Sequence, residues 1–133
     1  MKSAFLIAGV SLIVLAHAGA AAAATAFVAP SEKAPGSEAV RYIADAGETN
    51  RVTVTYPDSD DDVEITDGGA TITAGSGCTS LAPNKVACGF VSTFDVELGD
   101  GNDVLVLDVE SAESVLRGGG RERQDSRRWG FVR

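Results

Sequence analysis

The chain has 133 residues, a formal net charge of −8 and one histidine, and 44% of its residues are hydrophobic. This length is enough for one small domain, and the acidic balance argues against a nucleic-acid partner, because phosphate would be repelled. The same charge suits cations, although an acidic surface also serves simple solubility.

The N-terminus has the layout of a secretory signal peptide. Lys2 provides a positive charge, residues 4–16 are uncharged and apolar, and small residues that suit cleavage follow. Cleavage sites are expected after Ala18 or where the alanine run ends, at Ala24 or Ala26, and we place the signal peptide at 1–26. An uncleaved membrane anchor is the alternative, but no basic stop-transfer cluster follows the apolar stretch. We therefore expect a secreted protein with no membrane partner after cleavage.

Export determines the available chemistry. The one histidine, His17, leaves with the signal peptide, which removes the usual general base and the commonest zinc ligand. The two cysteines, Cys78 and Cys88, are expected to form a disulfide outside the cell. No serine or cysteine then has a histidine to activate it, so we do not expect an enzyme.

A proline-containing linker is expected over 27–39, and a β domain over 40–98. Period-two patterning with β-branched residues and turn punctuation predicts strands rather than helices. The expected strands are 51–56, 63–66, 70–73, 91–98 and 104–109, with Pro83 and Asn84 as a turn inside the cysteine loop. The predicted fold class is therefore mainly β, a small antiparallel sandwich or meander leading into an incipient parallel β-roll, after a helical signal peptide.

A glycine–aspartate motif lies between the last two expected strands. It consists of Gly99, Asp100, Gly101, Asn102 and Asp103, and Val104 and Leu105 follow it. Glycines allow tight turns and bring carbonyl oxygens close to a cation, and Asp103 adds a charged oxygen. Calcium takes about six to eight oxygen ligands, so these five residues are the candidate metal site. A hairpin turn is the alternative, because these are ordinary turn residues.

The segment from Val40 to Leu105 resembles the N-terminal portion of secreted bacterial calcium-binding proteins with repeats-in-toxin (RTX) glycine/aspartate nonapeptides. A Thr/Val-rich β segment, a loop between Cys78 and Cys88 and a first GDGND carry the resemblance, although Leu98 stands where the nonapeptide has its first glycine. The resemblance implies calcium as the ligand, held between successive turns of a β-roll. It also implies a repeat start over 99–120.

The next repeat begins near Ser114 and gives way to an arginine-rich tail, 121–133. If those arginines use CGN codons, the frame shifted by one base permits a complete nonapeptide. We therefore hypothesise that the repeat array is truncated and that the tail is an out-of-frame end. A disordered terminus is one alternative, and a basic tail that binds an anionic cell-envelope polymer is another.

Two functions follow from these patterns. The first is a secreted, non-catalytic calcium-binding RTX-type fragment whose folding is coupled to calcium, with weak binding because the array is short. The second is an extracellular structural or adhesive β protein that binds no metal and uses GDGND as a turn.

Overall fold

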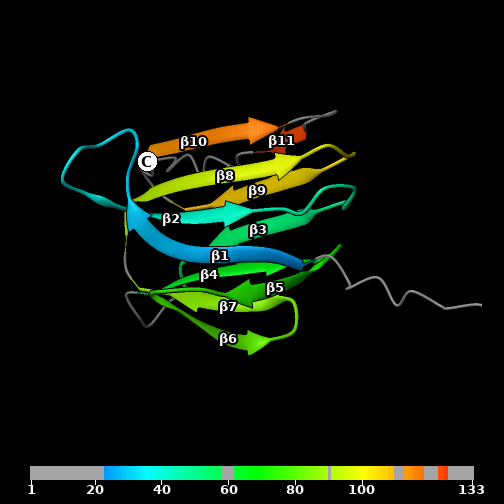
Figure 1. Ribbon diagram of the computed structural model, residues 1–133, viewed down its shortest axis with the longest axis horizontal. Helices are drawn as coiled ribbons and strands as arrows, with labels where there is room; N and C mark the ends of the chain where they lie inside the picture. The colour runs from blue at the N-terminus through cyan, green and yellow to red at the C-terminus, as the bar shows by residue number, and fades with distance from the viewer. Residues whose placement is uncertain (1–22, 58–61, 90, 110–112, 119–122, 126–133) are drawn as a thin grey trace, which may run out of the picture.

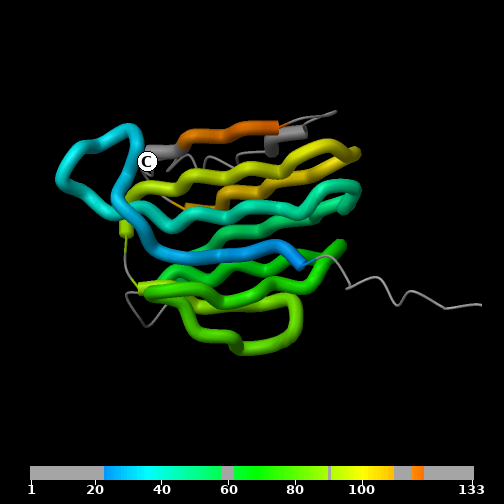
Figure 2. The backbone as a smooth tube through the Cα atoms, viewed as in Figure 1, coloured from blue at the N-terminus to red at the C-terminus, as the bar shows by residue number. Residues whose placement is uncertain are grey.

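The computed structural model describes residues 23–57, 62–89, 91–109, 113–118 and 123–125, and within these ranges the chain is mainly β. Two layers of strands face each other (Figures 1 and 2). The strands are β1 (Ala23–Pro30), β2 (Glu38–Ile43), β3 (Arg51–Thr55), β4 (Val63–Asp67), β5 (Thr71–Ala74), β6 (Cys78–Ala82), β7 (Lys85–Cys88), β8 (Thr93–Gly99), β9 (Val104–Asp108), β10 (Glu113–Gly118) and β11 (Arg123–Asp125). No helix in the described ranges is long and apolar enough to cross a membrane.

Each layer is one mixed sheet. The first has the strand order β10-β8-β2-β1-β5, and the second has the order β11-β9-β3-β4-β7-β6. The expected mainly β, sandwich-like class is confirmed, but the antiparallel sheets expected for the sandwich are wrong, because both sheets are mixed. Strands β2, β8 and β10 run parallel, as do β3, β9 and β11. Antiparallel pairs join β1 to β2 and connect β3, β4, β7 and β6.

The parallel half has a regular path. The chain passes from the first sheet to the second between β2 and β3, again between β8 and β9, and again between β10 and β11. Each new strand lies parallel to the strand of the previous passage in its own sheet. Consecutive strands in this half therefore belong to different sheets, and the described connections 44–50 and 100–103 cross from one layer to the other (Figure 1).

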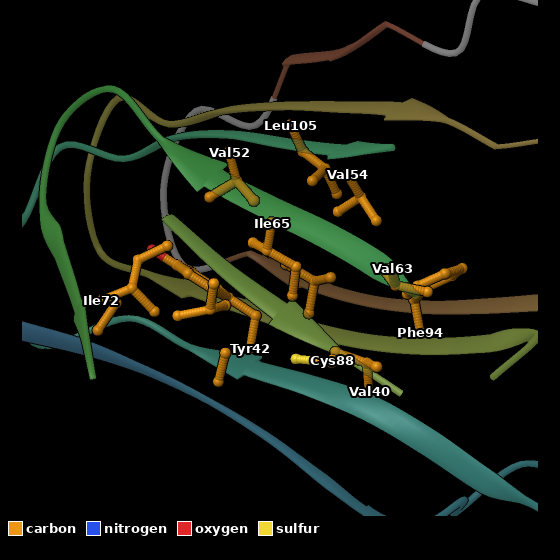
Figure 3. Close-up of a cluster of buried hydrophobic side chains, with 14 of the residues drawn as sticks. Val40, Tyr42, Val52, Val54, Val63, Ile65, Ile72, Cys88, Phe94 and Leu105 are labelled. Carbon is orange, nitrogen blue, oxygen red and sulfur yellow. The ribbon is translucent and has the colours of Figure 1, made fainter. Parts of the chain in front are cut away.

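The core lies between the layers. The period-two patterns predicted it well, because alternate residues of a strand point to opposite faces of the sheet. Val52 and Val54 are fully buried, and Phe94, Val96 and Leu98 are nearly so. Val52 and Val54 of the second sheet and Phe94 of the first belong to one buried cluster between the layers (Figure 3). The other fully or nearly buried apolar residues are Ala24, Ala26, Ala39, Val40, Tyr42, Val63, Ile65, Ile72, Val86, Cys88, Val91 and Leu105.

Two segments differ from their predicted roles. Strand β1 starts at Ala23, so the end of the expected signal peptide (1–26) lies inside the fold, with Ala24 and Ala26 fully buried. The expected linker 27–39 instead contains the second half of β1, a loop and the start of β2. The sequence pattern did not predict this strand, because its fully buried residues are the small Ala24 and Ala26 and because it ends at Pro30. Within the tail 121–133, β11 pairs with β9, and the other residues lie outside the described ranges.

The predicted disulfide is confirmed. The sulfurs of Cys78 and Cys88 are 2.02 Å apart, and the two residues face each other across the antiparallel pair β6–β7. Pro83 and Asn84 form the predicted turn between these strands. The covalent bond therefore joins the outermost strand of the second sheet to its neighbour.

Candidate functional site

The glycine–aspartate turn 99–103 connects the two sheets. Gly99 ends β8 with a φ of 69°, in the left-handed region that favours glycine, and the chain enters β9 at Val104. Strands β8 and β9 lie in different sheets and do not pair with each other. The turn is therefore not a hairpin, and that alternative for GDGND is excluded.

A second loop, residues 44–50, lies against this turn and connects β2 to β3. The Gly47 N–H donates to Oδ1 of Asp100 at 3.1 Å, and the Asn50 N–H donates to Oδ1 of Asp103 at 2.9 Å. The Asn50 carbonyl in turn accepts the Val104 N–H at 2.9 Å. Residues 47–50 are thus joined to residues 100–104 by three hydrogen bonds, and in two of them the aspartates of the motif are the acceptors.

Gly101 is required by the closeness of the two loops. A Cβ built on it would lie 2.5 Å from the Glu48 carbonyl oxygen and 2.8 Å from Oδ1 of Asp103. No real Cβ makes contacts that short, so any larger residue would push the loops apart. The glycine therefore serves the backbone approach that its place in the motif predicts.

A buried polar cluster, made up of Tyr42, Glu48, Asn50 and Asp67, lies beneath the loop. The Tyr42 hydroxyl donates to Oδ2 of Asp67 at 2.6 Å, and Nδ2 of Asn50 donates to the same oxygen at 2.8 Å. The Asn50 amide also lies 3.2 Å from the Tyr42 hydroxyl and 3.2 Å from Oε2 of Glu48. Tyr42, Asn50 and Asp67 have no exposed surface. The backbone of Asn50 therefore contacts the glycine–aspartate turn, and its side chain contacts the buried cluster.

Asp67 remains ionised inside the protein because donors surround it. Burial by itself raises the pKa of Asp67, but hydrogen bonds from Tyr42, Asn50 and the backbone N–H groups of Arg51 and Gly69 outweigh that effect and hold the pKa below its ordinary value. Burial, and then the hydrogen bond to Asp67, raise the pKa of Tyr42 far above its ordinary value. The tyrosine is thus a permanent donor and the aspartate a permanent acceptor.

Two acceptor oxygens of loop 44–50 stand out. Oε1 of Glu48 and Oδ1 of Asn50 are both buried, and neither has a hydrogen-bond partner among the described residues. Leaving a buried acceptor without a partner is expensive, at about 1–3 kcal/mol for each group. Both oxygens belong to the loop that contacts the glycine–aspartate turn, so a cation bound there would find acceptors that the protein itself does not use.

The donor chemistry of the two loops fits a hard cation. Carboxylates, a side-chain amide and backbone carbonyls supply oxygen only, which calcium and magnesium prefer. The number of side chains is less favourable. Within the described residues, no group of three or more His, Cys, Asp or Glu side chains could hold a metal ion. Any such site would therefore depend on backbone and amide oxygens, and Oδ1 of Asp100 and Oδ1 of Asp103 already accept backbone N–H groups.

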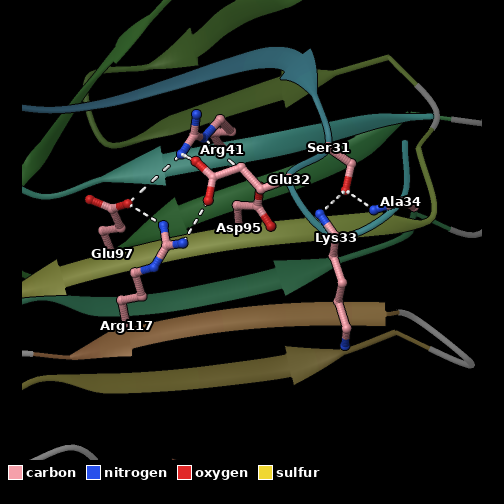
Figure 4. A network of polar contacts seen from close by, with 8 residues as sticks. All are labelled: Ser31, Glu32, Lys33, Ala34, Arg41, Asp95, Glu97 and Arg117. Atoms are coloured by element: carbon pink, nitrogen blue, oxygen red, sulfur yellow. Dashed lines mark hydrogen bonds and ion pairs between the residues drawn. The ribbon is translucent and has the colours of Figure 1, made fainter. Parts of the chain in front are cut away.

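A second polar group, the outer ion-pair cluster, lies on the face of the first sheet away from the core (Figure 4). Glu32, from the loop between β1 and β2, contacts Arg41 at 2.7 Å and Arg117 at 2.6 Å. Arg117 also contacts Glu97 at 2.9 Å, and Arg41 lies 3.9 Å from Asp95. The cluster thus connects the loop after β1 with β2, β8 and β10.

The sequence patterns found the turn 99–103 but missed its partner, loop 44–50. One signal was present. Gly47 and Asn50 precede the alternation of Val52 and Val54, much as the glycines and Asp103 precede the alternation of Leu105 and Leu107. The first passage between the sheets therefore carries a weakened version of the second, in which the acidic residues Asp45 and Glu48 do not follow the GDGND spacing that made the second recognisable.

The comparisons with known proteins give no relative. No protein-family model matches the chain, and neither the curated proteins nor the solved structures contain a match.

Proposed function

We propose that this chain is an exported, non-catalytic calcium-binding protein of the RTX type, in which loop 44–50 and turn 99–103 are two adjacent turns of a parallel β-roll. The observation that carries the proposal is the direct stacking of these two loops at the end of two parallel ladders. Successive turns in contact are the arrangement that the RTX resemblance requires, because its calcium ions lie between turns.

The residues that would hold the ion come from both loops. Glu48 and Asn50 offer the two unpartnered buried oxygens, and Asp100 and Asp103 offer the carboxylate oxygens left over from their backbone hydrogen bonds. When bound, calcium would neutralise these acidic turns. The protein's part is to hold the two loops at hydrogen-bonding distance before any ion arrives.

Binding of this kind stabilises the folded chain. An ion that binds the native state and not the unfolded state adds stability in proportion to its concentration relative to its dissociation constant. Two turns offer few charged ligands, so we expect weak affinity, in the range of about 0.1–1 mM typical of extracellular calcium modules. Calcium outside a cell would then favour the folded state of an exported chain.

The test is a calcium titration of the exported protein, followed by circular dichroism and by melting temperature, with magnesium as the control ion. We expect calcium to raise the melting temperature and magnesium to have less effect. No change up to ~10 mM calcium, above the range of extracellular modules, would count against calcium binding by this chain.

Matched variants separate the site from general charge effects. Asp103→Asn keeps an oxygen able to accept the Asn50 N–H but removes the charge, and Glu48→Gln does the same for the unpartnered oxygen. Both should weaken the calcium response. Asp108→Asn removes an equal charge from an exposed position on β9 and should leave the response unchanged.

One observation favours the alternative of an extracellular structural or adhesive β protein. Asp100 and Asp103 already accept backbone N–H groups from loop 44–50, so the turn is held without a cation. Such a protein would melt at the same temperature with calcium and with a chelator, which is the result that distinguishes the two functions.

A further inference from the structure

The first residues of strand β1 belong to the core. Ala24 and Ala26 are fully buried. Residues 23–26 pair in parallel with 71–74 of β5, and residues 25–30 pair antiparallel with β2. The Ala26 carbonyl also accepts the Gly75 N–H at 2.7 Å. The first sheet thus depends on β1 to join β5 to its other strands.

This arrangement restricts where a signal peptide can be removed. Cleavage after Ala24 would delete the start of β1, and cleavage after Ala26 would delete both buried alanines and all four residues that pair with β5. Either product would lack part of the sheet. A cut at or before Ala22 leaves every described residue in place.

The position of Ala23 points to one cut among those that remain. Its backbone nitrogen lies 3.2 Å from Oδ2 of Asp45, at an exposed site. Asp45 belongs to loop 44–50, whose Gly47 donates to Asp100 of the glycine–aspartate turn. Strand β1 begins at the same end of the molecule as these two loops (Figure 1). A charge on this nitrogen would therefore face a carboxylate of the candidate site's own loop.

We propose that a membrane signal peptidase cuts this chain between Ala22 and Ala23, and that the new amino terminus pairs with Asp45. Hydrolysis consumes one water molecule, leaves a carboxylate on Ala22 and frees the amino group of Ala23, which takes up a proton at neutral pH. Ala20 and Ala22 supply the small residues that the peptidase requires at the third and first positions before the cut. The inference rests on the export part of the proposed function.

The mature N-terminus tests the cut directly. The full 133-residue chain is produced in a bacterium that exports proteins with such signals, and the exported product is examined by intact mass and N-terminal sequencing. We expect it to begin at Ala23. A product that begins at Gly19, Thr25 or Phe27 would overturn the assignment. If no product is exported, the inference and the secretion proposal both fall, whereas a failed calcium titration affects only the calcium proposal.

Two precursor variants sharpen the result. Ala22→Leu places a bulky residue directly before the proposed cut and should leave the precursor uncut or move the cut. Ala21→Leu, one residue earlier, should be cut normally, because that position tolerates large residues. Equal processing of the two variants would contradict a cut after Ala22.

The pairing with Asp45 needs its own measurement. The exported product is acetylated at its amino terminus under mildly acidic conditions, with single acetylation checked by mass, and melted beside the untreated product. Acetylation should lower the melting temperature, and the difference should shrink in high salt and disappear in Asp45→Asn. In Asp108→Asn, the charge-matched control, the difference should persist. An equal acetylation effect in wild type and Asp45→Asn would show that the amino terminus has another partner.

Discussion

Two polar groups of this protein lie on opposite faces of the same sheet and have very different surroundings. The buried polar cluster lies beside the core, and its members Tyr42, Asn50 and Asp67 have no exposed surface, while Glu48 is half-buried. The outer ion-pair cluster around Glu32 has short ion pairs and more full charges, and its members other than the buried Asp95 are partly exposed. Short charged contacts look strong in both places. We expect only the buried set to determine stability, because water competes for exposed ions and stabilises them when they separate.

Asp67→Ala should have the largest effect. It removes the acceptor of the Tyr42 hydroxyl, the Asn50 amide and the backbone N–H groups of Arg51 and Gly69. Several buried donors then lose their partner, so we expect a loss of about 3–5 kcal/mol in the free energy of unfolding. Urea denaturation measures it, with Asp108→Asn as the exposed control. A loss below about 1 kcal/mol would show that the buried cluster matters no more than a surface group.

Gly101→Ala tests the loop contact above the buried cluster. The added methyl would lie against the Glu48 carbonyl and the Asp103 carboxylate, so we expect a loss of about 1–3 kcal/mol, typical of overpacking. Gly89→Ala is the control, because a Cβ there meets no atom within 4 Å. Equal unfolding midpoints for the two variants would mean that loop 44–50 moves away at little cost.

Tyr42→Phe removes one donor from Asp67 and leaves the ring in place. The Asn50 amide and the two backbone N–H groups remain on the carboxylate, so we expect a smaller loss, of about 1–2 kcal/mol. Thermal and urea unfolding measure it. A loss equal to that of Asp67→Ala would mean that the tyrosine hydroxyl alone keeps the aspartate in place.

The pH dependence follows from the lowered pKa of Asp67. A carboxyl whose folded pKa lies below its unfolded value, about 3.9, stabilises the protein fully above that value. The contribution is lost as the pH falls through the lower folded pKa. Urea unfolding at pH 7 and at decreasing acidic pH should therefore show a loss of stability that is smaller in Asp67→Asn. If the stability of wild type and of Asp67→Asn fell equally with pH, Asp67 would not be the source of the pH dependence.

Glu32→Gln should have the smallest effect. Hydrogen bonding from Arg117, followed by the charges of Arg117 and Arg41, lowers the pKa of Glu32, yet the side chain is exposed and salt screens its ion pairs. We expect no measurable change in the melting temperature at physiological salt. A clear destabilisation that persists in high salt would show that the outer ion-pair cluster contributes to stability as the buried polar cluster does.

The sequence predicted the parts of the fold that large alternating residues mark. Strands over 51–55, 63–67, 93–99 and 104–108 were located from the alternation of valine, isoleucine, leucine and phenylalanine with polar residues. Strand β1 was missed because alanines and a proline gave no such contrast. The sequence also did not predict that β8 and β9 lie in different sheets, because alternation identifies strands but not the strands they pair with.

The site was predicted in part for a similar reason. Gly99, Asp100, Gly101 and Asp103 stand in a recognisable spacing, and the structure gives a role to the left-handed φ of Gly99 and to the small size of Gly101. Their partners, Glu48 and Asn50, lie far away in the sequence and carry no motif. Only the register of β2 with β8 and of β3 with β9 brings the two loops together.

The outermost positions of β10 and β11 have a consequence for how such a protein changes length. Each ends its own sheet beside a parallel strand, and together they form the third passage between the layers. A further pair of strands could add there by the same translation, without disturbing any side chain of the existing interior, so stability at this end would grow almost additively, as in solenoids. At the opposite end, β6 pairs antiparallel with β7 and is joined to it by the disulfide, so the parallel pattern does not repeat there. Lengthening by this translation therefore belongs to the end formed by β10 and β11.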